Sequence, residues 1–246
     1  MRTRVKFCGL VRPEDVDSAV AIGADAIGFV FYPKSARHLA PAEAAVLRRR
    51  LPSWVRAVGL FVNPAAAELE ACIREVGLDV VQAHGDERVE ALGALPVPCW
   101  KALRIGGQWT PEQDEVARAR CLAAGRVPAD AALVAQVLAA FDPVVECCLV
   151  DSASQGFGGS GHAFDWSVLP RPSRTPLVLA GGLTAGTVGA AIEALDPFAV
   201  DVSSGIQADG DPRRKDVSKM ERFMAAVLRA DVSRARAQAA DIERGR

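Results

Sequence analysis

Residues 4–15, Arg-Val-Lys-Phe-Cys-Gly-Leu-Val-Arg-Pro-Glu-Asp, introduce a pattern that the rest of the 246-residue chain repeats. The largely apolar run at residues 4–8 predicts a short β-strand, and Gly9 begins a loop. Pro13 suits the first position of a helix, the two acidic residues after it suit the first turn, and Gly23 is typical of a helix end. The chain therefore opens with a strand, a loop and a helix in that order.

Seven further strands are expected along the chain, each followed by polar or glycine-rich residues. They are residues 26–31, 57–62, 78–82, 97–103, 145–150, 177–180 and 199–202. Eight strand-then-helix units in sequence predict an α/β fold, a single closed (β/α)8 barrel of the TIM type. Between the strands, Pro41 is expected to begin one helix, and Asn63 to cap the next, whose first residue would be Pro64.

The barrel is expected to occupy residues 1–228 as one catalytic domain, with an enlarged helical segment at about 107–143. That segment carries two helix patterns separated by a break around Gly125, so we expect two helices there. Residues 229–246 form an Arg- and Ala-rich C-terminal extension. A solvated helix or a frayed terminus is the favoured interpretation of this extension, and a basic contact surface is the alternative.

Composition and charge exclude several classes of partner. The formal net charge is -1 and the charges are mixed along the chain, so we expect no nucleic acid or other polyanion as a partner. No apolar run reaches the roughly 18 residues of a membrane span, which predicts no membrane partner and a cytoplasmic location.

The six cysteines lack metal-ligand spacing, so no metal is expected, and the adjacent Cys147 and Cys148 should be buried on opposite faces of a strand. The oligomeric state stays open between monomer and homodimer.

Cys8 and Asp151 each end an apolar run at the point where the chain turns into a loop. The carboxyl ends of barrel strands carry the chemistry in this fold, so a thiol and a carboxylate there are a candidate base and acid. Lys6, two residues before Cys8, could share its face of the strand and favour the thiolate. The alternatives are a structural cysteine and a carboxylate that caps a loop N–H of Ser152 or Ser154.

Two turns of small residues follow the last two expected strands. Gly181 and Gly182 follow the first of these strands, and Ser203, Ser204 and Gly205 follow the second. Loops at these strand ends commonly form the phosphate site of barrels, because small residues let backbone N–H groups approach phosphate oxygens. They predict a small phosphorylated substrate, and the alternative is that these residues only make tight turns.

Two other loop residues are candidate substrate contacts. Arg37 follows the second expected strand, where its guanidinium could hold a planar carboxylate through two parallel hydrogen bonds. His84 follows the fourth expected strand and could hydrogen-bond a substrate or cap a helix at Asp86 and Glu87. The glycine-rich run within residues 155–166 could be a flexible cover for the site or a plain linker.

With these residues assembled, the chain resembles the phosphoribosylanthranilate isomerase family of tryptophan biosynthesis, in register from Val5 to about Val227. Nine motifs carry the resemblance, and their agreement in order is what makes it specific. They are Lys-Phe-Cys-Gly at 6–9, Gly-Ala-Asp-Ala-Ile-Gly-Phe-Val-Phe at 23–31, Ser-Ala-Arg at 35–37, Val-Gly-Leu-Phe-Val-Asn at 58–63, Val-Gln-Ala-His-Gly-Asp-Glu at 81–87, Leu-Val-Asp-Ser at 149–152, Phe-Asp-Trp at 164–166, Leu-Ala-Gly-Gly-Leu at 179–183 and Asp-Val-Ser-Ser-Gly at 201–205.

The resemblance implies a reaction and a role for each candidate residue. The reaction is the Amadori rearrangement of N-(5-phosphoribosyl)anthranilate, with Asp151 as the general acid that opens the sugar ring and Cys8 as the general base that removes the C2 proton. The resemblance implies no metal and no redox cofactor. Arg37 would pair with the anthranilate carboxylate. Main-chain N–H groups would hold the ribose phosphate, chiefly those of Gly182, Ser203 and Ser204.

The chain departs from the family pattern at Ala36, at Ala83, at His162-Ala163 and in the longer 107–143 segment. These departures bear on loop closure and phosphate contacts rather than on the acid and the base. Two other functions are compatible with the same motifs. One is an isomerase or lyase that acts on another sugar phosphate, and the other is a non-catalytic barrel that binds a phosphorylated metabolite.

Overall fold

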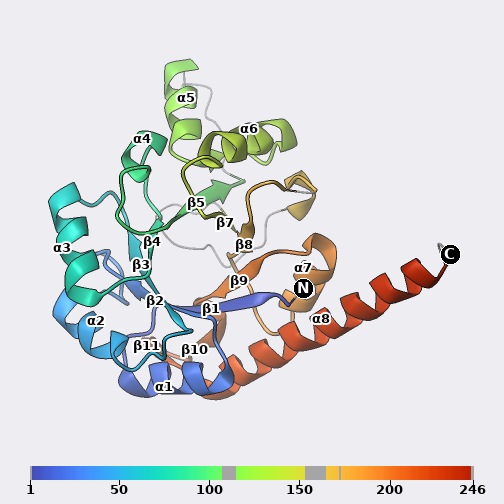
Figure 1. Cartoon of the computed structure of the whole chain (residues 1–246), viewed down its shortest axis with the longest axis horizontal. Coiled ribbons are helices and arrows are strands. Elements are labelled where there is room, and N and C mark those ends of the chain that lie inside the picture. The colour runs from blue at the N-terminus through green and yellow to red at the C-terminus, as the bar shows by residue number, and fades with distance from the viewer. Residues whose placement is uncertain (1, 107–114, 153–164, 172, 245–246) are drawn as a thin grey trace.

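The computed structural model describes residues 2–106, 115–152, 165–171 and 173–244. Its main sheet consists of parallel strands in the order β4-β3-β2-β1-β9-β8-β7-β5, and pairing of β4 with β5 closes the sheet into a barrel (Figure 1). The barrel strands are β1 (Arg4–Cys8), β2 (Ala26–Val30), β3 (Arg56–Phe61), β4 (Val80–Ala83), β5 (Cys99–Ile105), β7 (Cys147–Ser152), β8 (Leu177–Leu179) and β9 (Ala199–Val202). The closed (β/α)8 barrel predicted from the sequence is confirmed, and each strand lies within two residues of its predicted bounds.

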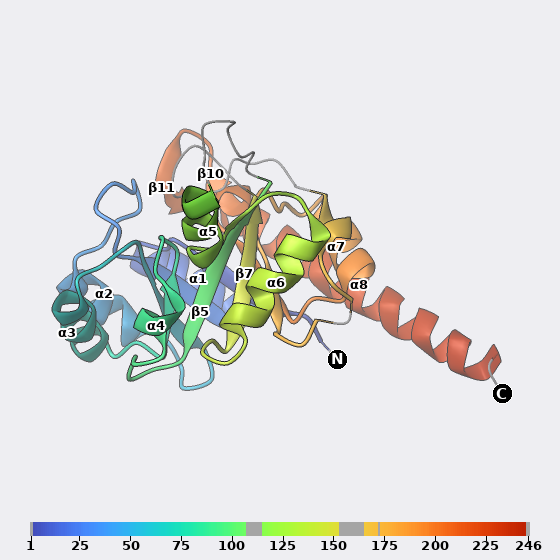
Figure 2. The same cartoon turned by 90° about the horizontal axis from the view of Figure 1, so that it is seen from above.

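Helices surround the barrel on its outer face (Figures 1 and 2). They are α1 (Pro13–Ile22), α2 (Pro41–Arg48), α3 (Ala66–Val76), α4 (Val89–Leu92), α5 (Glu115–Ala123), α6 (Ala131–Phe141), α7 (Val188–Leu195) and α8 (Val217–Arg244). Gly23 and Gly77 end α1 and α3 in the left-handed conformation, which a glycine adopts without strain. None of the helices within the described ranges is long and apolar enough to cross a membrane.

The strands bury both of their faces, as parallel strands do. Successive side chains alternate between the helices outside and the barrel interior, so the adjacent Cys147 and Cys148 point to opposite sides, as predicted. Cys147 packs inside with Val58, Trp100 and neighbouring apolar residues, whereas Cys148 packs in the cluster between sheet and helices. The same alternation directs the polar residues near the strand ends into the upper interior of the barrel.

The enlarged segment contains the two predicted helices, α5 and α6, with Gly125 between them in the left-handed conformation. A two-residue strand that the sequence did not predict, β6 (Arg126–Val127), joins them and pairs with the end of β5. Its two residues are too few to produce a recognisable alternation. Residues 107–114, at the start of the enlarged segment, lie outside the described residues.

One predicted helix start is wrong, and one of the two alternatives for His84 is not observed. Pro64 is not the first residue of α3, which begins at Ala66, and Asn63 does not cap it. Asn63 instead has a positive φ of 48°, and its side-chain oxygen accepts a hydrogen bond from the backbone N–H of Asp86 at 2.7 Å. His84 likewise does not cap a helix at Asp86 and Glu87, because α4 begins only at Val89.

The last helix is the longest element of the molecule. Its first half buries Met220, Phe223 and Val227 against the barrel, whereas Leu228 and Val232 are about half exposed. Beyond the barrel, α8 continues as a helix to Arg244 and projects away from the other elements in both views (Figures 1 and 2). A short antiparallel hairpin of β10 (Gln207–Ala208) and β11 (Asp211–Lys215), not predicted from the sequence, connects β9 to this helix.

Candidate active site

A cavity of about 150 Å³ opens at the carboxyl ends of the barrel strands. Eight of the nine candidate residues line it: Cys8, Arg37, His84, Asp151, Gly181, Gly182, Ser203 and Ser204. These residues come from the ends of β1, β4, β7, β8 and β9 and from the β2–α2 loop. Gln82 and Asp201 also line the cavity, although neither was singled out as a site residue from the sequence.

Cys8 is the last residue of β1 and is buried, with Lys6 two residues before it on the same inward face. The Lys6 ammonium lies 2.8 Å from a carboxylate oxygen of Asp201 on the neighbouring strand β9, and both side chains are almost fully buried. Burial alone would lower the pKa of Lys6, but the negative charge of Asp201 and the interaction with Cys8 outweigh it and raise that pKa. A positive charge therefore lies beside the thiol, which is the setting in which a cysteine can act as a base.

Space for the Cys8 sulfur comes from a glycine on the adjacent strand. Gly28 pairs in register with Cys8, and a β-carbon at Gly28 would lie 2.7 Å from Cys8 Sγ, closer than real contacts allow. The sulfur therefore occupies the volume that any other residue at position 28 would fill. This requirement accounts for the glycine within an otherwise apolar strand.

Asp151 lies near the end of β7 and is 5% exposed. One of its carboxylate oxygens is 3.7 Å from Nε2 of His84, and the other ring nitrogen of His84, Nδ1, is 2.9 Å from the amide nitrogen of Gln82. Burial, followed by the positive charges of Lys101 and Lys6, lowers the pKa of His84 to about 3. His84 is therefore a neutral imidazole beside the candidate acid.

The alternative role of Asp151, capping of a loop N–H, involves Ser152 or Ser154. Ser152 is the last residue of β7, and Ser154 lies outside the described residues, as does most of the glycine-rich run at 155–166. The inward position of Asp151 in the cavity wall is what the candidate acid requires.

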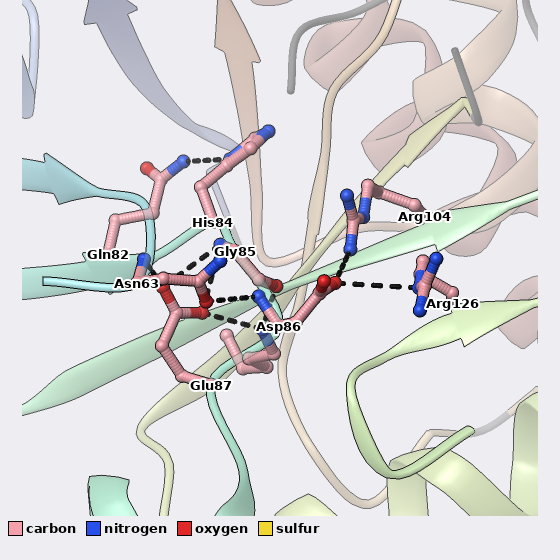
Figure 3. Close-up of polar contacts among 9 residues, drawn as sticks. Asn63, Gln82, His84, Gly85, Asp86, Glu87, Arg104 and Arg126 are labelled. Atoms are coloured by element: carbon pink, nitrogen blue, oxygen red, sulfur yellow. Dashed lines mark hydrogen bonds and ion pairs between the residues drawn. The ribbon is translucent and has the colours of Figure 1, made fainter. Parts of the chain in front are cut away.

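The loop that carries His84 is held by a set of charged and polar groups on its outer side (Figure 3). The carboxylate of Glu87 accepts hydrogen bonds from the backbone N–H groups of Asn63 and Gly85 and from the buried ammonium of Lys101, all at 2.8–3.0 Å. Asp86 forms an ion pair with Arg104 at the end of β5, and the same carboxylate oxygen lies 3.5 Å from Nε of Arg126. His84 is thus presented by a loop that has little freedom to move.

Arg37 reaches the cavity from the loop after β2. Its side chain lies across Gly9, where a β-carbon would approach the arginine Cδ to 2.6 Å. One terminal nitrogen donates a 3.4 Å hydrogen bond to Gln207, and within the described part of the chain the buried Nε has no hydrogen-bond partner. A guanidinium that lines a cavity and keeps donors unused can receive a carboxylate from a ligand.

The two small-residue turns lie side by side at the ends of β8 and β9. Gly181 and Gly182 both have positive φ angles, of 77° and 69°. Ser204 and Gly205 begin the one-turn helix η2 (Ser204–Ile206). Gly205 is not among the described residues that line the cavity; instead, a β-carbon on it would lie 2.1 Å from the carbonyl oxygen of Leu183. Its role in the structure is to let the two turns pack against each other.

Ser203 connects the second turn to Cys8. Its hydroxyl donates a 2.9 Å hydrogen bond to the carbonyl oxygen of Cys8, and the ammonium of Lys215 donates one of 2.9 Å to the carbonyl oxygen of Ser203. Burial, followed by the like charge of Arg37, lowers the pKa of Lys215 to about 8. The candidate phosphate turn and the candidate base are therefore part of one hydrogen-bonded unit.

Sequence reasoning missed the residues whose roles depend on pairing across the barrel. Asp201 stood in a quoted motif, but its pairing with Lys6 joins positions 195 residues apart. Gln82 stood in the motif at 81–87 without a role of its own, and Lys215 stood in none of the quoted motifs. For Gln82, one available signal was a polar residue at an inward position of a strand otherwise made of apolar residues.

A closed (β/α)8 barrel with a thiol, a carboxylate, a guanidinium and two small-residue turns around one cavity defines a barrel enzyme that acts on a small anionic molecule. The family model described as N-(5'phosphoribosyl)anthranilate (PRA) isomerase matches residues 5–125 and 119–226. The chain belongs to this isomerase family.

Individual relatives agree with the family match. The N-(5'-phosphoribosyl)anthranilate isomerase of Dechloromonas aromatica is 42% identical over 233 residues, which cover 95% of this chain and 100% of that protein. The crystal structure of the phosphoribosyl anthranilate isomerase of Thermotoga maritima superposes with a TM-score of 0.74 at 35% identity, covering 92% of this chain and 98% of that one. The family and the isomerase class predicted from the sequence are confirmed.

Two further solved structures describe a ligand and an assembly. A phosphoribosyl anthranilate isomerase in complex with reduced 1-(o-carboxyphenylamino)-1-deoxyribulose 5-phosphate has a TM-score of 0.67 at 31% identity, covering 92% of this chain and 98% of that one. Another, with a TM-score of 0.68 at 33% identity and the same coverage, consists of monomers generated from the dimeric isomerase of Thermotoga maritima.

Proposed function

We propose that this chain catalyses the Amadori rearrangement of N-(5-phosphoribosyl)anthranilate to 1-(2-carboxyphenylamino)-1-deoxyribulose 5-phosphate, with Asp151 as general acid and Cys8 as general base. The reaction is the isomerase step of tryptophan biosynthesis that the family performs. The observation that carries the assignment of roles is that β1 and β7 bring Cys8 and Asp151 into one cavity, with Arg37 and the two small-residue turns at the same opening.

The first chemical step opens the sugar ring. Asp151 gives its proton to the ring oxygen, the bond between C1 and that oxygen breaks, and the lone pair of the anthranilate nitrogen forms a C=N bond to C1. The product of this step is an open-chain iminium ion, and Asp151 becomes a carboxylate. His84 is neutral at Asp151 and leaves the carboxyl group able to hold the proton that this step requires.

The second step moves the double bond. The Cys8 thiolate removes the C2 proton, and the electrons of the C–H bond form a C1=C2 bond while the iminium nitrogen recovers its lone pair. The resulting enolamine then becomes the 2-ketone: its enol proton passes to the Asp151 carboxylate, and the Cys8 thiol returns a proton to C1, so both side chains regain their starting states. Lys6 supplies the positive charge that accompanies the thiolate in this buried position.

Arg37 and the two turns hold the opposite ends of the substrate. The guanidinium of Arg37 receives the anthranilate carboxylate in a bidentate pair. Main-chain N–H groups at Gly182, Ser203 and Ser204 hold the phosphate, with the charge of Lys215 close behind Ser203. The ligand of the solved family complex carries both a carboxyphenyl group and a 5-phosphate, which supports a site with two separate anion-binding ends.

We further propose that residues 1–228 form the catalytic domain and that residues 229–246 are an Arg- and Ala-rich extension outside it. The enzyme works in the cytoplasm as a monomer or a homodimer, without a nucleic-acid or membrane partner. The net charge of -1 supports the absence of a polyanionic partner. The dimeric relative from Thermotoga maritima supports the homodimer.

The test of this function is the loss of anthranilate-type fluorescence when purified protein meets N-(5-phosphoribosyl)anthranilate formed in situ. We expect rapid loss with the unmodified chain. Arg37→Ala should raise KM for this substrate by about 100-fold, because a charge-assisted bidentate pair contributes roughly 2–3 kcal/mol.

A control substrate separates this function from that of another sugar-phosphate isomerase. Ribose 5-phosphate lacks the amine nitrogen that forms the iminium ion, so it should not be turned over. It also lacks the aromatic carboxylate, so its weak competition should be the same for Arg37→Ala and the unmodified protein. Absence of fluorescence loss with folded, unmodified protein would overturn the proposed function. Equal effects of Arg37→Ala on both molecules would overturn the role of Arg37.

A further inference from the structure

The cavity wall beside Asp151 contains two polar side chains, and the two chemical steps do not explain how these side chains act together. Gln82, on the inward face of β4, is fully buried, and His84, two residues later on the same face, is 6% exposed. Figure 3 shows the two side chains and the contact between them. Gln82 Nε2 lies 2.9 Å from His84 Nδ1, and His84 Nε2 lies 3.7 Å from Asp151 Oδ2. The three side chains therefore form a row that ends at the acid.

We propose that Gln82 is a positioning residue of the isomerisation: it fixes the tautomer of His84 so that the Nε2 proton stabilises the Asp151 carboxylate formed on ring opening, and its own amide oxygen accepts a hydrogen bond from the bound substrate. This inference rests on the proposed function, because it takes Asp151 to be the general acid. It adds to that function a group that sets the hydrogen bonding of the acid.

The direction of the row follows from hydrogen-bond chemistry. An amide nitrogen can only donate, so Nδ1 of His84 must accept the hydrogen bond from Gln82. A neutral imidazole carries one N–H, which leaves the proton on Nε2. That proton points to the side of the ring on which Asp151 lies. When Asp151 has given its proton to the substrate, the new carboxylate has a donor 3.7 Å away, and a shift of about 0.7 Å would complete the hydrogen bond.

The charge state of His84 decides whether this arrangement helps an acid or disables it. An imidazolium beside Asp151 would hold the carboxyl group ionised and remove the proton needed for ring opening. The charged groups that face His84 are Lys101 and Arg104 of β5, Lys6 of β1 and Asp151 of β7. Burial and the three cations lower the pKa of His84 to about 3, so the ring donates a hydrogen bond without carrying a charge.

The amide oxygen of Gln82 is the atom that we propose contacts the substrate. Within the described residues, Gln82 Oε1 is buried and has no hydrogen-bond partner, while Gln82 contributes to the cavity wall. A buried acceptor without a donor destabilises a protein, and in a binding site a ligand commonly supplies the missing donor. The substrate class that fits carries an N–H or O–H near its reacting carbons, as the amine and the ribose hydroxyls of a phosphoribosyl amine do.

The first experiment reads the tautomer directly and needs no turnover. The chain has three histidines, so protein labelled with ¹⁵N-histidine gives three sets of ring signals, and a His84→Gln sample identifies those of residue 84. We expect His84 to show a neutral ring protonated at Nε2 from pH 5 to pH 8. In Gln82→Glu, whose carboxylate can only accept at neutral pH, the ring should become protonated at Nδ1. An Nδ1-protonated or doubly protonated His84 in the unmodified protein overturns the inference.

The second experiment measures turnover. Gln82→Glu should lower kcat roughly 100-fold and shift the pH profile of kcat, because the acid loses its donor. Gln82→Met, which keeps the volume of the side chain, should lower kcat roughly 10-fold and raise KM. Gln136→Glu makes the same chemical change on the exposed face of α6 and should leave kcat, KM and the pH profile unchanged.

The outcomes separate this inference from the proposed function. No isomerase activity in the unmodified protein would overturn the proposed function, whatever the tautomer of His84. An active protein in which Gln82→Glu keeps the kcat and pH profile of the unmodified chain would overturn the inference and leave the function standing. If Gln82→Glu does not fold, Gln82→Met at unchanged kcat and KM overturns the inference by the same argument.

Discussion

Buried charges surround the two reacting side chains. Lys6 and Asp201 form an ion pair inside the barrel, just below Cys8. Such a pair is rarely more stable than apolar residues of the same volume, because both charges must leave water. Its presence in the upper barrel interior is therefore better explained by the need for a cation beside Cys8 than by stability.

Removal of the Lys6 charge tests this explanation. Lys6→Met should lower the free energy of unfolding by about 3–5 kcal/mol, because Asp201 is left buried and unpaired. The double variant Lys6→Met/Asp201→Leu should recover most of that stability but not the activity, since Cys8 still lacks its cation. Urea unfolding and kcat on the same samples check both parts. Recovery of full activity in the double variant would contradict the role of Lys6.

His84 gives the protein a defined sensitivity to acid. Its pKa is about 3 when folded and 6.5 when unfolded, so only the unfolded chain takes up a proton as the pH falls below 6.5. Stability that is present above pH 6.5 is therefore lost as the pH falls toward 3, by about 2 kcal/mol between pH 7 and pH 5. His84→Gln should lose about 2 kcal/mol less than the unmodified protein over this interval. Urea unfolding at pH 7 and pH 5 measures the stability that each protein loses. If His84→Gln and the unmodified protein lost the same amount, the neutral, buried state of His84 would be refuted.

For single residues, the sequence predicted where along a strand each side chain lies, but not which side chain of another strand it contacts. Cys8 and Asp151 end apolar runs, so their places at strand ends could be predicted. The partners of these residues could not, because the pairing of Lys6 with Asp201 depends on the lateral register of β1 and β9. The row from Gln82 to Asp151 depends in the same way on closure of the barrel.

Among the loops and strands, the two small-residue turns pack so closely that even one added methyl group should disturb them. Gly205→Ala would place a β-carbon 2.1 Å from the carbonyl oxygen of Leu183. We expect a loss of about 1–3 kcal/mol in stability and a higher KM, because the turns must separate and their N–H groups move. Thermal unfolding and steady-state kinetics measure the two effects.

Gly189→Ala is the matched control for that substitution. Gly189 lies in α7, and a β-carbon there would meet no atom of the described residues within 4 Å. Alanine should therefore stabilise the helix by roughly 0.5–1 kcal/mol and leave KM unchanged. If Gly205→Ala behaved like Gly189→Ala, the close packing of the turns would not matter for binding.

Individual elements also show where sequence patterns fail. The pair Asn63-Pro64 has the composition of a helix start, yet α3 begins two residues later because the Asn63 side chain binds the backbone of Asp86 in the next loop. The hairpin of β10 and β11 includes Asp-Pro-Arg-Arg-Lys at 211–215, which has no apolar alternation to mark a strand. Both elements are determined by contacts with other parts of the chain.

On the scale of the whole molecule, the N-terminal strand and the last helix are fastened together near the point where α8 leaves the barrel. Asp231 accepts hydrogen bonds from the backbone N–H and the hydroxyl of Thr3, at 2.8 and 2.7 Å. Arg234 pairs with both Asp231 and Asp196. The barrel thereby connects its first strand to its last helix at a point before the projecting part of α8.

A truncation and a point variant separate these two parts of α8. A chain that ends after Gln238 should keep its activity and lose less than about 0.5 kcal/mol of stability, as exposed positions usually do. Asp231→Ala should cost about 1–3 kcal/mol, because the buried Thr3 N–H loses its acceptor. Thermal unfolding measures the stability of the truncated chain and of Asp231→Ala relative to the unmodified protein. A truncated chain as unstable as Asp231→Ala would show that the extension is part of the fold.

The central claim is that Cys8 and Asp151 perform the two proton transfers rather than bind the substrate. The most direct measurement compares single-turnover rates on N-(5-phosphoribosyl)anthranilate, and Kd values for reduced 1-(o-carboxyphenylamino)-1-deoxyribulose 5-phosphate, in the unmodified protein, Cys8→Ala and Asp151→Asn. We predict that each variant binds this ligand within about tenfold of the unmodified protein and turns over at least about 1,000-fold more slowly. A variant that retains turnover within tenfold, or one that loses binding and turnover in equal measure, would contradict the claim.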